Sequence, residues 1–331
     1  MDALRWREFT SYAMATALLG VVGRSGLAHA DVLKQARIVL GFPAGSNGDA
    51  LCRLFADKIK GRYAENVIVE NKAGAAGRIG VDAVKAAPAD GATLLFTPTS
   101  VLTLYPHIYK TLNYDPFNDF VPLSRAATVT FALAIGPKAP ADIKTLPQFV
   151  EWCRANPSLA NFGSPGAGSS PHFLGATFAK AANISLNHVA YRGTSAAVMD
   201  LIGGQIPAVV VSPGNVTQYA KSGQVRILAV TSPARWELLP DIPTMAELGY
   251  PKATYLEQFA FFMKRGADAE VIDHAASAIR AAAAMPDVIK TLAEVDMKVE
   301  ASASAVLTQS LRAEYDHWRD IVKSVGFTPQ D

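Results

Sequence analysis

The sequence contains few of the residues that mark several large classes of protein. Cysteine occurs only at Cys52 and Cys153, and no CxxC, HExxH or clustered His and Cys residues indicate a metal site. The formal net charge is only +2, without a dense basic block, which argues against nucleic acid or an anionic membrane as the partner. After residue 30 no apolar run approaches the roughly 18 to 20 residues of a membrane-spanning helix, so we expect a soluble chain.

The first thirty residues have the pattern of a secretory signal peptide rather than of a folded element. Arg5 and Arg7 precede a short apolar stretch at 12–22, and Ala28-His29-Ala30 is a small-x-small cleavage site. An uncleaved membrane anchor is the alternative, but the stretch is too short to span a bilayer. No cysteine follows the site, so a bacterial lipid anchor is not indicated. The pattern predicts export to the periplasm.

The two cysteines lie in a chain that we expect to be exported, where a disulfide can form. Cys52 and Cys153 are about 100 residues apart, and each falls within an amphipathic helical pattern. We therefore interpret them as two free, buried cysteines that behave as small hydrophobic residues.

Strand-like runs alternate with helix-like runs along most of the chain. This alternation is typical of an α/β protein with parallel sheets. The runs that predict strands are 38–42, 67–70, 93–97, 131–135, 161–163, 188–191, 208–211 and 226–230.

A chain of this length usually folds into two domains. The alternation is interrupted at 116–125 and at 233–251, which we interpret as crossings or decorations at a domain boundary. The segment 271–327 is helical and is predicted to return to the first domain. Two α/β lobes joined by two crossings form a cleft. The predicted boundaries are a signal peptide at 1–30, a first lobe at 31–129 and 255–331, and a second lobe at 130–254.

Three glycine-rich turns each connect a predicted strand to a predicted helix. They lie within "RIVLGFPAGSNGDALCRLFADKI" (37–59), "NFGSPGAGSSPHFLGATF" (161–178) and "HVAYRGTSAAVMDLIGGQ" (188–205). Ligands of open α/β sheets bind beyond the carboxyl ends of the strands, and the unpaired N–H groups at a helix start attract an anion. The alternative is that the glycines only permit tight turns. Three such turns on both lobes favour a bound anion.

Polar residues mark where the three helices are expected to begin. Ser46 is the predicted N-cap of the first helix. Ser170 is the predicted N-cap of the second, because Pro171 then occupies the first helical position. Thr194 or Ser195 is predicted to cap the third helix.

The sequence favours a carboxylate over a phosphate as this anion. "GSPGAGSS" has the spacing of a P-loop, but Ser169 stands where the phosphate-binding Lys is required. No G-x-G-x-x-G motif indicates a dinucleotide. Asp49 lies in the first turn of its helix, where its charge opposes a multiply charged group, although it can also form a capping box with Ser46.

Catalysis is the principal alternative to binding. The segment 44–48 is similar to the G-x-S-x-G elbow of α/β-hydrolases, and Ser46, Asp200 and His317 have the chain order of a hydrolase triad. The elbow, however, normally follows several strands, and here it follows the first. His317 belongs to a polar helix, and we interpret it as a surface residue. These features favour binding over a secreted serine hydrolase.

Seven blocks of the sequence resemble, in order, the substrate-binding proteins of tripartite tricarboxylate transporters, the TctC or Bug family. The blocks are FPAGSNGDALCR, VIVENKAGAAGRIG, APADGATLLF, YDPFNDFVPLS, GSPGAGSSPHFLG, HVAYRGTSAAVMDLIGGQ and PDIPTMAELGYP. The resemblance implies a two-lobed type II periplasmic-binding-protein fold, each lobe a mostly parallel sheet flanked by helices. It implies a monomeric receptor, without cofactor or catalytic activity, that closes on a small carboxylate and delivers it to integral membrane subunits. A receptor that signals instead of transporting would use the same cleft.

The resemblance also implies a set of ligand-binding residues on the two lobes. On the first lobe they are Phe42, Ala44, Gly45, Ser46, Asp49, Thr97 and Ser100. On the second lobe they are Ser164, Gly168, Ser169, Ser170, His172, Tyr191, Gly193 and Asp200.

Two positions depart from the pattern of the family. Ser46 stands in the first turn where the family usually has a second glycine, and Gln258 stands where it usually has Trp. Both changes affect which ligand fits: a dicarboxylate, a tricarboxylate, an acidic amino acid or an aromatic acid.

The signal peptide makes a direct prediction about the exported protein. Cleavage after Ala30 gives a mature chain that begins at Asp31. N-terminal sequencing of the protein from a periplasmic extract should read Asp-Val-Leu-Lys. A periplasmic protein that still begins at Met1 would contradict the prediction.

Overall fold

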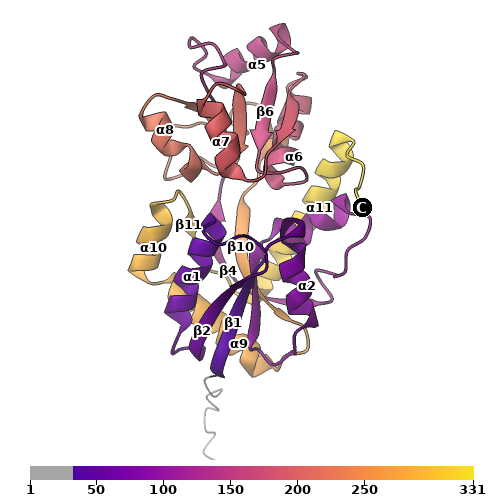
Figure 1. Cartoon of the computed structure of the whole chain (residues 1–331), viewed down its shortest axis with the longest axis vertical. Helices are drawn as coiled ribbons and strands as arrows, with labels where there is room; N and C mark the ends of the chain where they lie inside the picture. Colours follow the sequence, from indigo (N-terminus) through magenta and orange to yellow (C-terminus); the bar gives the residue numbers. More distant parts are fainter. Residues whose placement is uncertain (1–32) are drawn as a thin grey trace, which may run out of the picture. The chain divides into compact units, whose positions relative to one another are not determined.

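The computed structural model describes residues 33–331, so the predicted signal peptide lies outside the described residues. Two sheets organise this part of the chain (Figure 1). One has six strands in the order β11-β4-β10-β3-β1-β2, and the other has five in the order β7-β6-β8-β5-β9. We call the part built on the six-stranded sheet the first lobe and the part built on the five-stranded sheet the second lobe. The predicted two-lobed α/β fold is confirmed.

The elements of the first lobe come from both ends of the described chain. Its strands are β1 Leu33–Leu40, β2 Ala64–Asn71, β3 Thr93–Pro98, β4 Phe120–Val129, β10 Glu257–Lys264 and β11 Lys298–Val299. Its helices are α1 Asn47–Ile59, η1 Ala75–Gly77, α2 Arg78–Ala86, α3 Ser100–Thr103, α4 Tyr105–Ile108, α9 Ala269–Ala283, α10 Pro286–Ala293 and α11 Ser304–Val325.

The second lobe is formed by the middle of the chain. Its strands are β5 Ala132–Ile135, β6 Asn161–Ser164, β7 Asn187–Ala190, β8 Ala208–Val211 and β9 Arg226–Val230. Its helices are α5 Leu146–Ala155, α6 Ser170–Ala181, α7 Thr194–Ile202, η2 Pro213–Asn215 and α8 Thr217–Lys221, and η3 Pro251–Ala253 precedes the return to the first lobe.

Each of the eight predicted strands overlaps a strand of the structure, but two expectations are wrong. The segment 116–125 is not only a crossing, because β4 begins at Phe120. The sheets are also not mostly parallel: of the nine pairings between described strands, four are parallel and five antiparallel. The physical reason is that β5 enters the second lobe, and β10 re-enters the first, against the direction of their neighbours.

The first lobe buries both faces of its sheet, as the period of two along its strands requires. Ile38 and Leu40 of β1 join a core with Phe55 of α1 and Phe261 of β10. Val39 points the other way, into a core beneath α2 and α11. Because residues from both lobes share this second core, the lobes meet through apolar packing as well as through the connecting chain.

The pairing registers place the carboxyl ends of the parallel strands at the junction between the lobes. In the second lobe, Ala132 enters from the first lobe and pairs with Val211 and Val230, the last residues of β8 and β9. Strands β6 and β7 run parallel to β8, so they end at the same edge. In the first lobe, Glu257 at the start of β10 pairs with Val129 at the end of β4. Strand β3 is antiparallel to β10, and β1 is parallel to β3, so both end here too.

Helix α11 crosses from the first lobe to the second beside this junction (Figure 1). The ring of Trp318 on α11 lies 6.3 Å from that of Phe173 on α6, and Phe327 after α11 lies 5.1 Å from the same ring. The Lys180 side chain donates to the carbonyl of Ser324. Through these contacts, α11 packs against the second lobe along one side of the junction.

Both cysteines are buried and free, as predicted. Cys52 lies in α1 of the first lobe, and Cys153 in α5 of the second. Within residues 33–331, none of the helices combines the length and apolarity needed to cross a membrane.

Candidate functional site: the junction between the lobes

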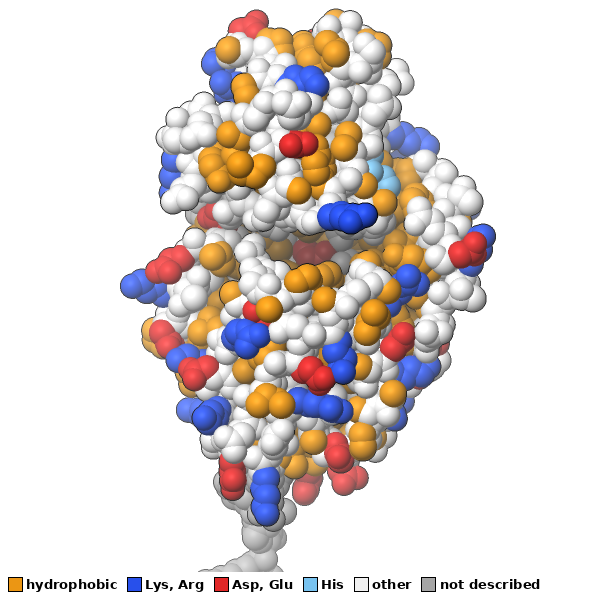
Figure 2. All heavy atoms as spheres, in the orientation of Figure 1, with side chains coloured by type: hydrophobic (Ala, Val, Ile, Leu, Met, Phe, Trp, Pro, Cys, Tyr) orange, Lys and Arg blue, Asp and Glu red, His pale blue; other side chains and the backbone are white. Residues whose placement is uncertain are grey.

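The surface between the lobes is hollowed, with acidic atoms at the base of the hollow and a basic side chain on its upper rim (Figure 2). Helices α1, α6 and α7 each begin one turn after a strand that ends at this junction. The first N–H groups of each helix have no partner within the helix. The three predicted turns therefore converge on one region, with neutral donors on both sides.

A buried carboxylate shapes the turn before α1. Ser46 is the N-cap, as predicted, and its Oγ accepts from the Asp49 N–H at 3.2 Å. Asp49 Oδ2 accepts from the Gly45 N–H at 2.9 Å and from Arg53 Nε at 3.0 Å, and Asp49 Oδ1 accepts from Asn71 Nδ2 at 2.9 Å. Asp49 is 4% exposed, so its oxygens serve the turn.

These bonds also decide the charge of Asp49. Burial opposes ionisation, but the bonds from Arg53, the Gly45 N–H and Asn71 outweigh it and lower the pKa of Asp49. A fixed negative charge behind the turn disfavours a multiply charged ligand there, which agrees with the argument against phosphate.

The remaining predicted residues of the first lobe lie at the ends of β1 and β3. The Phe42 carbonyl accepts from Asn71 Nδ2 at 3.1 Å, and Ala44 is exposed in the turn. Thr97 and Ser100 are 1% and 7% exposed at the end of β3 and the start of α3. The Ser100 N–H donates to Glu257 Oε1 at 3.3 Å.

Two stacked histidines support the turn before α6. The rings of His172 and His188 are 3.8 Å apart and nearly parallel, at 23°. His188 Nε2 lies 2.7 Å from Ser164 Oγ, and His172 Nδ1 accepts from the Gly168 N–H at 3.2 Å. Burial lowers the pKa of both rings to about 4, and for His188 the neighbouring ring adds to the effect. Both histidines are therefore neutral at physiological pH.

Both predicted N-caps of the second lobe are off by one residue. Ser169, not Ser170, is the N-cap of α6, so Pro171 is the second helical residue. The Ser169 hydroxyl donates to the Gly166 carbonyl at 2.7 Å and makes no capping bond. Gly193 is the N-cap of α7, and its φ of 108° suits glycine where Thr194 or Ser195 was expected to cap. Beside it, the Tyr191 hydroxyl donates to Asp200 Oδ2 at 2.8 Å.

A network of buried glutamates, which the sequence analysis did not predict, lies at the base of the junction. Glu257 and Glu314 are 5% and 6% exposed. The Tyr255 hydroxyl lies 3.1 Å from Glu257 Oε1 and 2.9 Å from Glu314 Oε1, and it has one proton to donate. Glu314 also accepts from the hydroxyls of Thr99 and Thr103 at 2.9 and 2.6 Å. Burial raises the pKa of both glutamates, that of Glu314 to about 7.

One bond of this network joins the lobes. Ser170 Oγ of α6 donates to Glu257 Oε2 of β10 at 2.8 Å, and both residues are buried. Ser100 and Ser170, which we predicted as ligand donors, thus both donate to a carboxylate of the chain itself.

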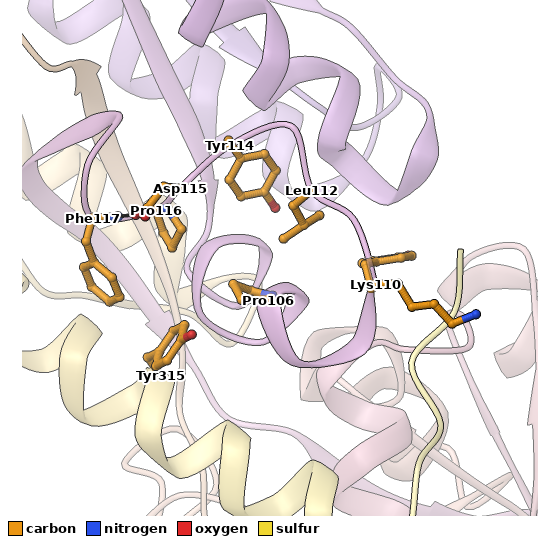
Figure 3. A pocket seen from close by; sticks show the side chains of 9 residues that line it. Pro106, Lys110, Leu112, Tyr114, Asp115, Pro116, Phe117 and Tyr315 are labelled. Carbon is orange, nitrogen blue, oxygen red and sulfur yellow. Dashed lines mark hydrogen bonds between the residues drawn. The ribbon is translucent and has the colours of Figure 1, made fainter.

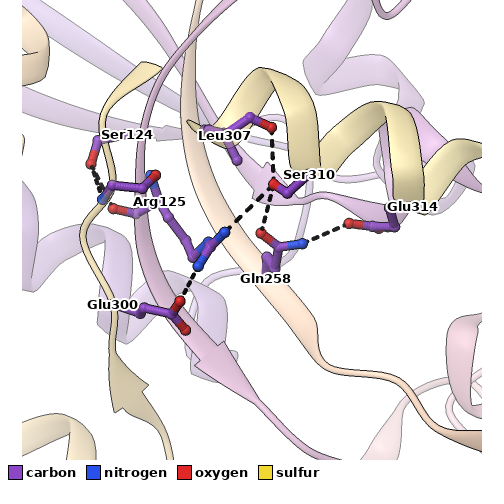
Figure 4. A network of polar contacts seen from close by, with 8 residues as sticks. Ser124, Arg125, Gln258, Glu300, Leu307, Ser310 and Glu314 are labelled. Atoms are coloured by element: carbon purple, nitrogen blue, oxygen red, sulfur yellow. Dashed lines mark hydrogen bonds and ion pairs between the residues drawn. The ribbon is translucent and has the colours of Figure 1, made fainter. Parts of the chain in front are cut away.

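Further hydrogen bonds extend the network from Glu314 to Arg125 of β4 (Figure 4). Gln258 Nε2 donates to Glu314 Oε2 at 2.9 Å, and Ser310 Oγ donates to Gln258 Oε1 at 3.4 Å. Arg125 contacts Ser310 and forms an ion pair with Glu300. Gln258, the departure from the family pattern, therefore links β10 to two residues of α11, Ser310 and the buried Glu314.

A signal for Glu314 was present in the sequence. The buried residues of α11 recur every three or four positions, at Leu307, Leu311, Glu314, Trp318 and Ile321, so Glu314 falls on the apolar face. A charged residue at a core position of an amphipathic helix indicates a buried polar partner. Glu257 has a weaker signal, because it lies at the start of an apolar strand.

The residues of the hydrolase alternative lie apart in the structure. Ser46 Oγ accepts from the Asp49 N–H, and Asp200 accepts from Tyr191, in different lobes. His317 is half-buried rather than on the surface as we expected, because its ring stacks on Tyr255 at 6.4 Å. In residues 33–331, the His, Cys, Asp and Glu side chains form no group of three or more that could hold a metal ion.

Two small pockets on the first lobe contain none of the predicted residues. One, of about 240 Å³, lies between Pro106, Phe117 and Tyr315 (Figure 3). The other, of about 220 Å³, lies between Arg78 and Asn113. Neither is between the lobes, so the site is defined by the hollow and its convergent donors.

The fold and the site define a two-lobed solute-binding protein, and sequence comparison identifies its family. Residues 51–327 match the sequence profile described as "Tripartite tricarboxylate transporter family receptor". The chain belongs to this family, known as TctC or Bug, whose members are periplasmic solute-binding proteins.

Known relatives match between 78% and 89% of the chain. Protein BugT of Bordetella pertussis is 33% identical over 267 residues, which are 78% of this chain and 81% of BugT. The solved structure of R. palustris Rpa4515 with adipate is 25% identical, with a TM-score of 0.81 over 89% of this chain and 98% of that one. The periplasmic binding protein BugD is 27% identical, with a TM-score of 0.79 over 89% of this chain and 99% of BugD.

The stacked histidines predict an acid-sensitive second lobe. Because their pKa is about 4 when folded and about 6.5 when unfolded, the stabilisation is complete above pH 6.5 and is lost as the pH falls towards 4. Between pH 6.5 and 5, the free energy of unfolding of the double variant His172→Gln, His188→Gln should fall by about 1 kcal/mol less than that of the wild type. This figure allows for the partial exposure of the two rings.

Urea titrations at both pH values measure this difference. An identical pH dependence in the wild type and the double variant would contradict the assignment.

Proposed function

We propose that this protein captures a small carboxylated metabolite between its lobes and delivers it to the integral membrane subunits of a tripartite transporter. We further propose that it acts as a monomer after export and cleavage at residue 30. The lobes of this proposal are 31–129 with 255–331, and 130–254. The ligand shifts the population towards a closed form, because only that form contacts it from both sides.

The convergence of three helix starts on one junction carries this proposal. Helices α1, α6 and α7 have 13, 12 and 9 residues, long enough for a positive amino end. The donors are backbone N–H groups and hydroxyls, and Asp49 and the glutamates add negative charge nearby. Neutral donors suit a singly charged group, and a relative with adipate bound supports a carboxylate.

The proposed ligand donors on the first lobe are Ala44 and Ser46, with Phe42 and Thr97 shaping the wall and the bond from Gly45 to Asp49 fixing the turn. On the second lobe we propose the turns from Ser164 to His172 and from Tyr191 to Gly193, with Asp200 fixing Tyr191. We propose that no bond of the ligand is broken, because Ser46, Asp200 and His317 each contact a different partner.

Filling the hollow should abolish binding without unfolding the protein. Ala167 is exposed in the turn before α6, whereas Ala181 is exposed at the opposite end of the same helix. Ala167→Trp should weaken carboxylate binding at least about tenfold, which corresponds to about 1.4 kcal/mol, and Ala181→Trp should not. Calorimetric titration with adipate and with hexanoate, beside thermal melts, measures both effects. Equal affinities of the two variants would place the ligand elsewhere.

Ser46 separates a binding protein from a hydrolase. Ser46→Ala removes the capping bond of α1 and should lower the free energy of unfolding by about 1 kcal/mol. Neither the wild type nor the variant should hydrolyse p-nitrophenyl esters above the rate in buffer. Esterase activity that is present in the wild type and lost in Ser46→Ala would overturn the proposal.

A further inference from the structure

Glu257 occupies an arrangement that is normally made for a ligand carboxylate. Three donors from separate segments converge on it: the Ser100 N–H at 3.3 Å, Ser170 Oγ at 2.8 Å and the Tyr255 hydroxyl at 3.1 Å. Ser170 belongs to the second lobe and Ser100 to the first. A carboxylate held by donors from both lobes is the arrangement expected of the closed, ligand-bound form, but here the chain itself supplies the carboxylate.

We propose that Glu257 is a specificity-determining residue that fills one carboxylate position of the junction, so that the protein selects ligands with a single carboxylate. This inference rests on the proposed function and names the class of ligand. Wild-type protein then prefers a monocarboxylate to a dicarboxylate of the same length, although adipate, a dicarboxylate, is bound in the Rpa4515 structure.

The position of Glu257 brings its charge close to the proposed ligand. Glu257 precedes Phe259 by two residues on β10, and a Cβ placed on Gly48 would lie 3.5 Å from the Phe259 ring. Gly48 is in the first turn of α1. The start of α1, where the ligand carboxylate is proposed to bind, and the strand that carries Glu257 are therefore in contact.

No cation among the described residues compensates this charge. Across residues 33–331, neither a Lys nor an Arg side chain hydrogen-bonds or pairs with Glu257 or Glu314. The nearest Arg in the network, Arg125, reaches Glu314 only through Ser310 and Gln258 (Figure 4). A second ligand carboxylate would find its donors occupied and would face two buried acids at low effective dielectric.

The groups around the two glutamates support this account. The Tyr255 hydroxyl, the hydroxyls of Thr99 and Thr103, the Gln258 amide, Ser100 and Ser170 face them, and the His317 ring stacks on Tyr255. All are neutral donors or neutral rings. His317 is included, because burial lowers its pKa and so favours the neutral ring.

Pairs of acids that differ by one carboxylate test the proposal. Hexanoate with adipate, butanoate with succinate, and benzoate with terephthalate are titrated calorimetrically at pH 7.5. Wild type should bind the monocarboxylate of the best pair about tenfold or more tightly. Glu257→Gln keeps the shape of the side chain and removes its charge, so it should lower the ratio of the affinity for the monocarboxylate to that for the dicarboxylate. Glu257→Ala should lower this ratio further. Glu151→Gln, an exposed acid on α5 with the same change in net charge, is the control and should leave it unchanged.

Acetate provides a test that does not depend on the natural ligand. Glu257→Ala removes a group with the size and charge of acetate and leaves the donors of Ser100 and Ser170 without their acceptor, whereas Tyr255 keeps Glu314. Sodium acetate should therefore raise the melting temperature of Glu257→Ala by about 2 °C or more over sodium chloride at equal ionic strength. The wild type and Glu151→Gln should show a smaller rise, because Glu257 already fills this position.

The outcomes separate this inference from the proposed function. A wild type that binds a dicarboxylate as tightly as its monocarboxylate, or a ratio unchanged in Glu257→Gln and Glu257→Ala, overturns the role of Glu257. Absence of the acetate effect also overturns it. Failure of the wild type to bind any acid of the three pairs, with the acetate effect present, overturns the proposed carboxylate ligand and leaves Glu257 as an internal anion.

Discussion

The need of a buried carboxylate for hydrogen-bond donors is the constraint on which the junction between the lobes depends. Glu257 is 5% exposed at the start of the strand that re-enters the first lobe. An ionised group in this position is stable only if donors surround it. Those donors come from α3, from Tyr255 and, through Ser170, from the second lobe. The same bonds that satisfy Glu257 therefore hold the two lobes at a defined distance.

In the proposed site, charge is arranged to admit one negative group and to oppose more. Asp49 is kept ionised behind the first turn, the paired glutamates lie at the base, and the histidines of the second lobe are held neutral by burial. What remains for a ligand is the set of N–H groups at the starts of α1, α6 and α7. Such a site binds through neutral donors and through closure, which fits a receptor that must also release its ligand to a transporter.

Local patterns in the sequence were enough to predict most elements of the fold. Ser46 was identified as an N-cap because its spacing to Asp49 is that of a capping box, and the structure has that capping bond. The caps of α6 and α7 were each misplaced by one residue, because the positive φ of Gly168 and Gly193 depends on a turn that the sequence does not specify. Strand β10 was not among the eight predicted strands. Its antiparallel direction could not be predicted either, because an apolar sequence has the same pattern whichever way the strand pairs.

The glutamate network shows where prediction from local patterns ends. Glu257 meets Ser100 and Ser170, which are 157 and 87 residues away along the chain. Glu314 meets Thr99 across 215 residues. Only the tertiary fold brings these partners together, and no local pattern in a single sequence reveals such long-range contacts. The resemblance to the family is the basis for proposing a site between the lobes, whereas the identity of the internal carboxylate came from the structure.

Native mass spectrometry of the protein isolated from the periplasm tests the central claim most directly. The account predicts one small molecule per chain, released on denaturation and containing a carboxylate. It also predicts that Ala167→Trp, isolated in the same way, is empty. A ligand without a carboxylate, such as a phosphorylated metabolite, or a molecule retained equally by Ala167→Trp, would contradict the account.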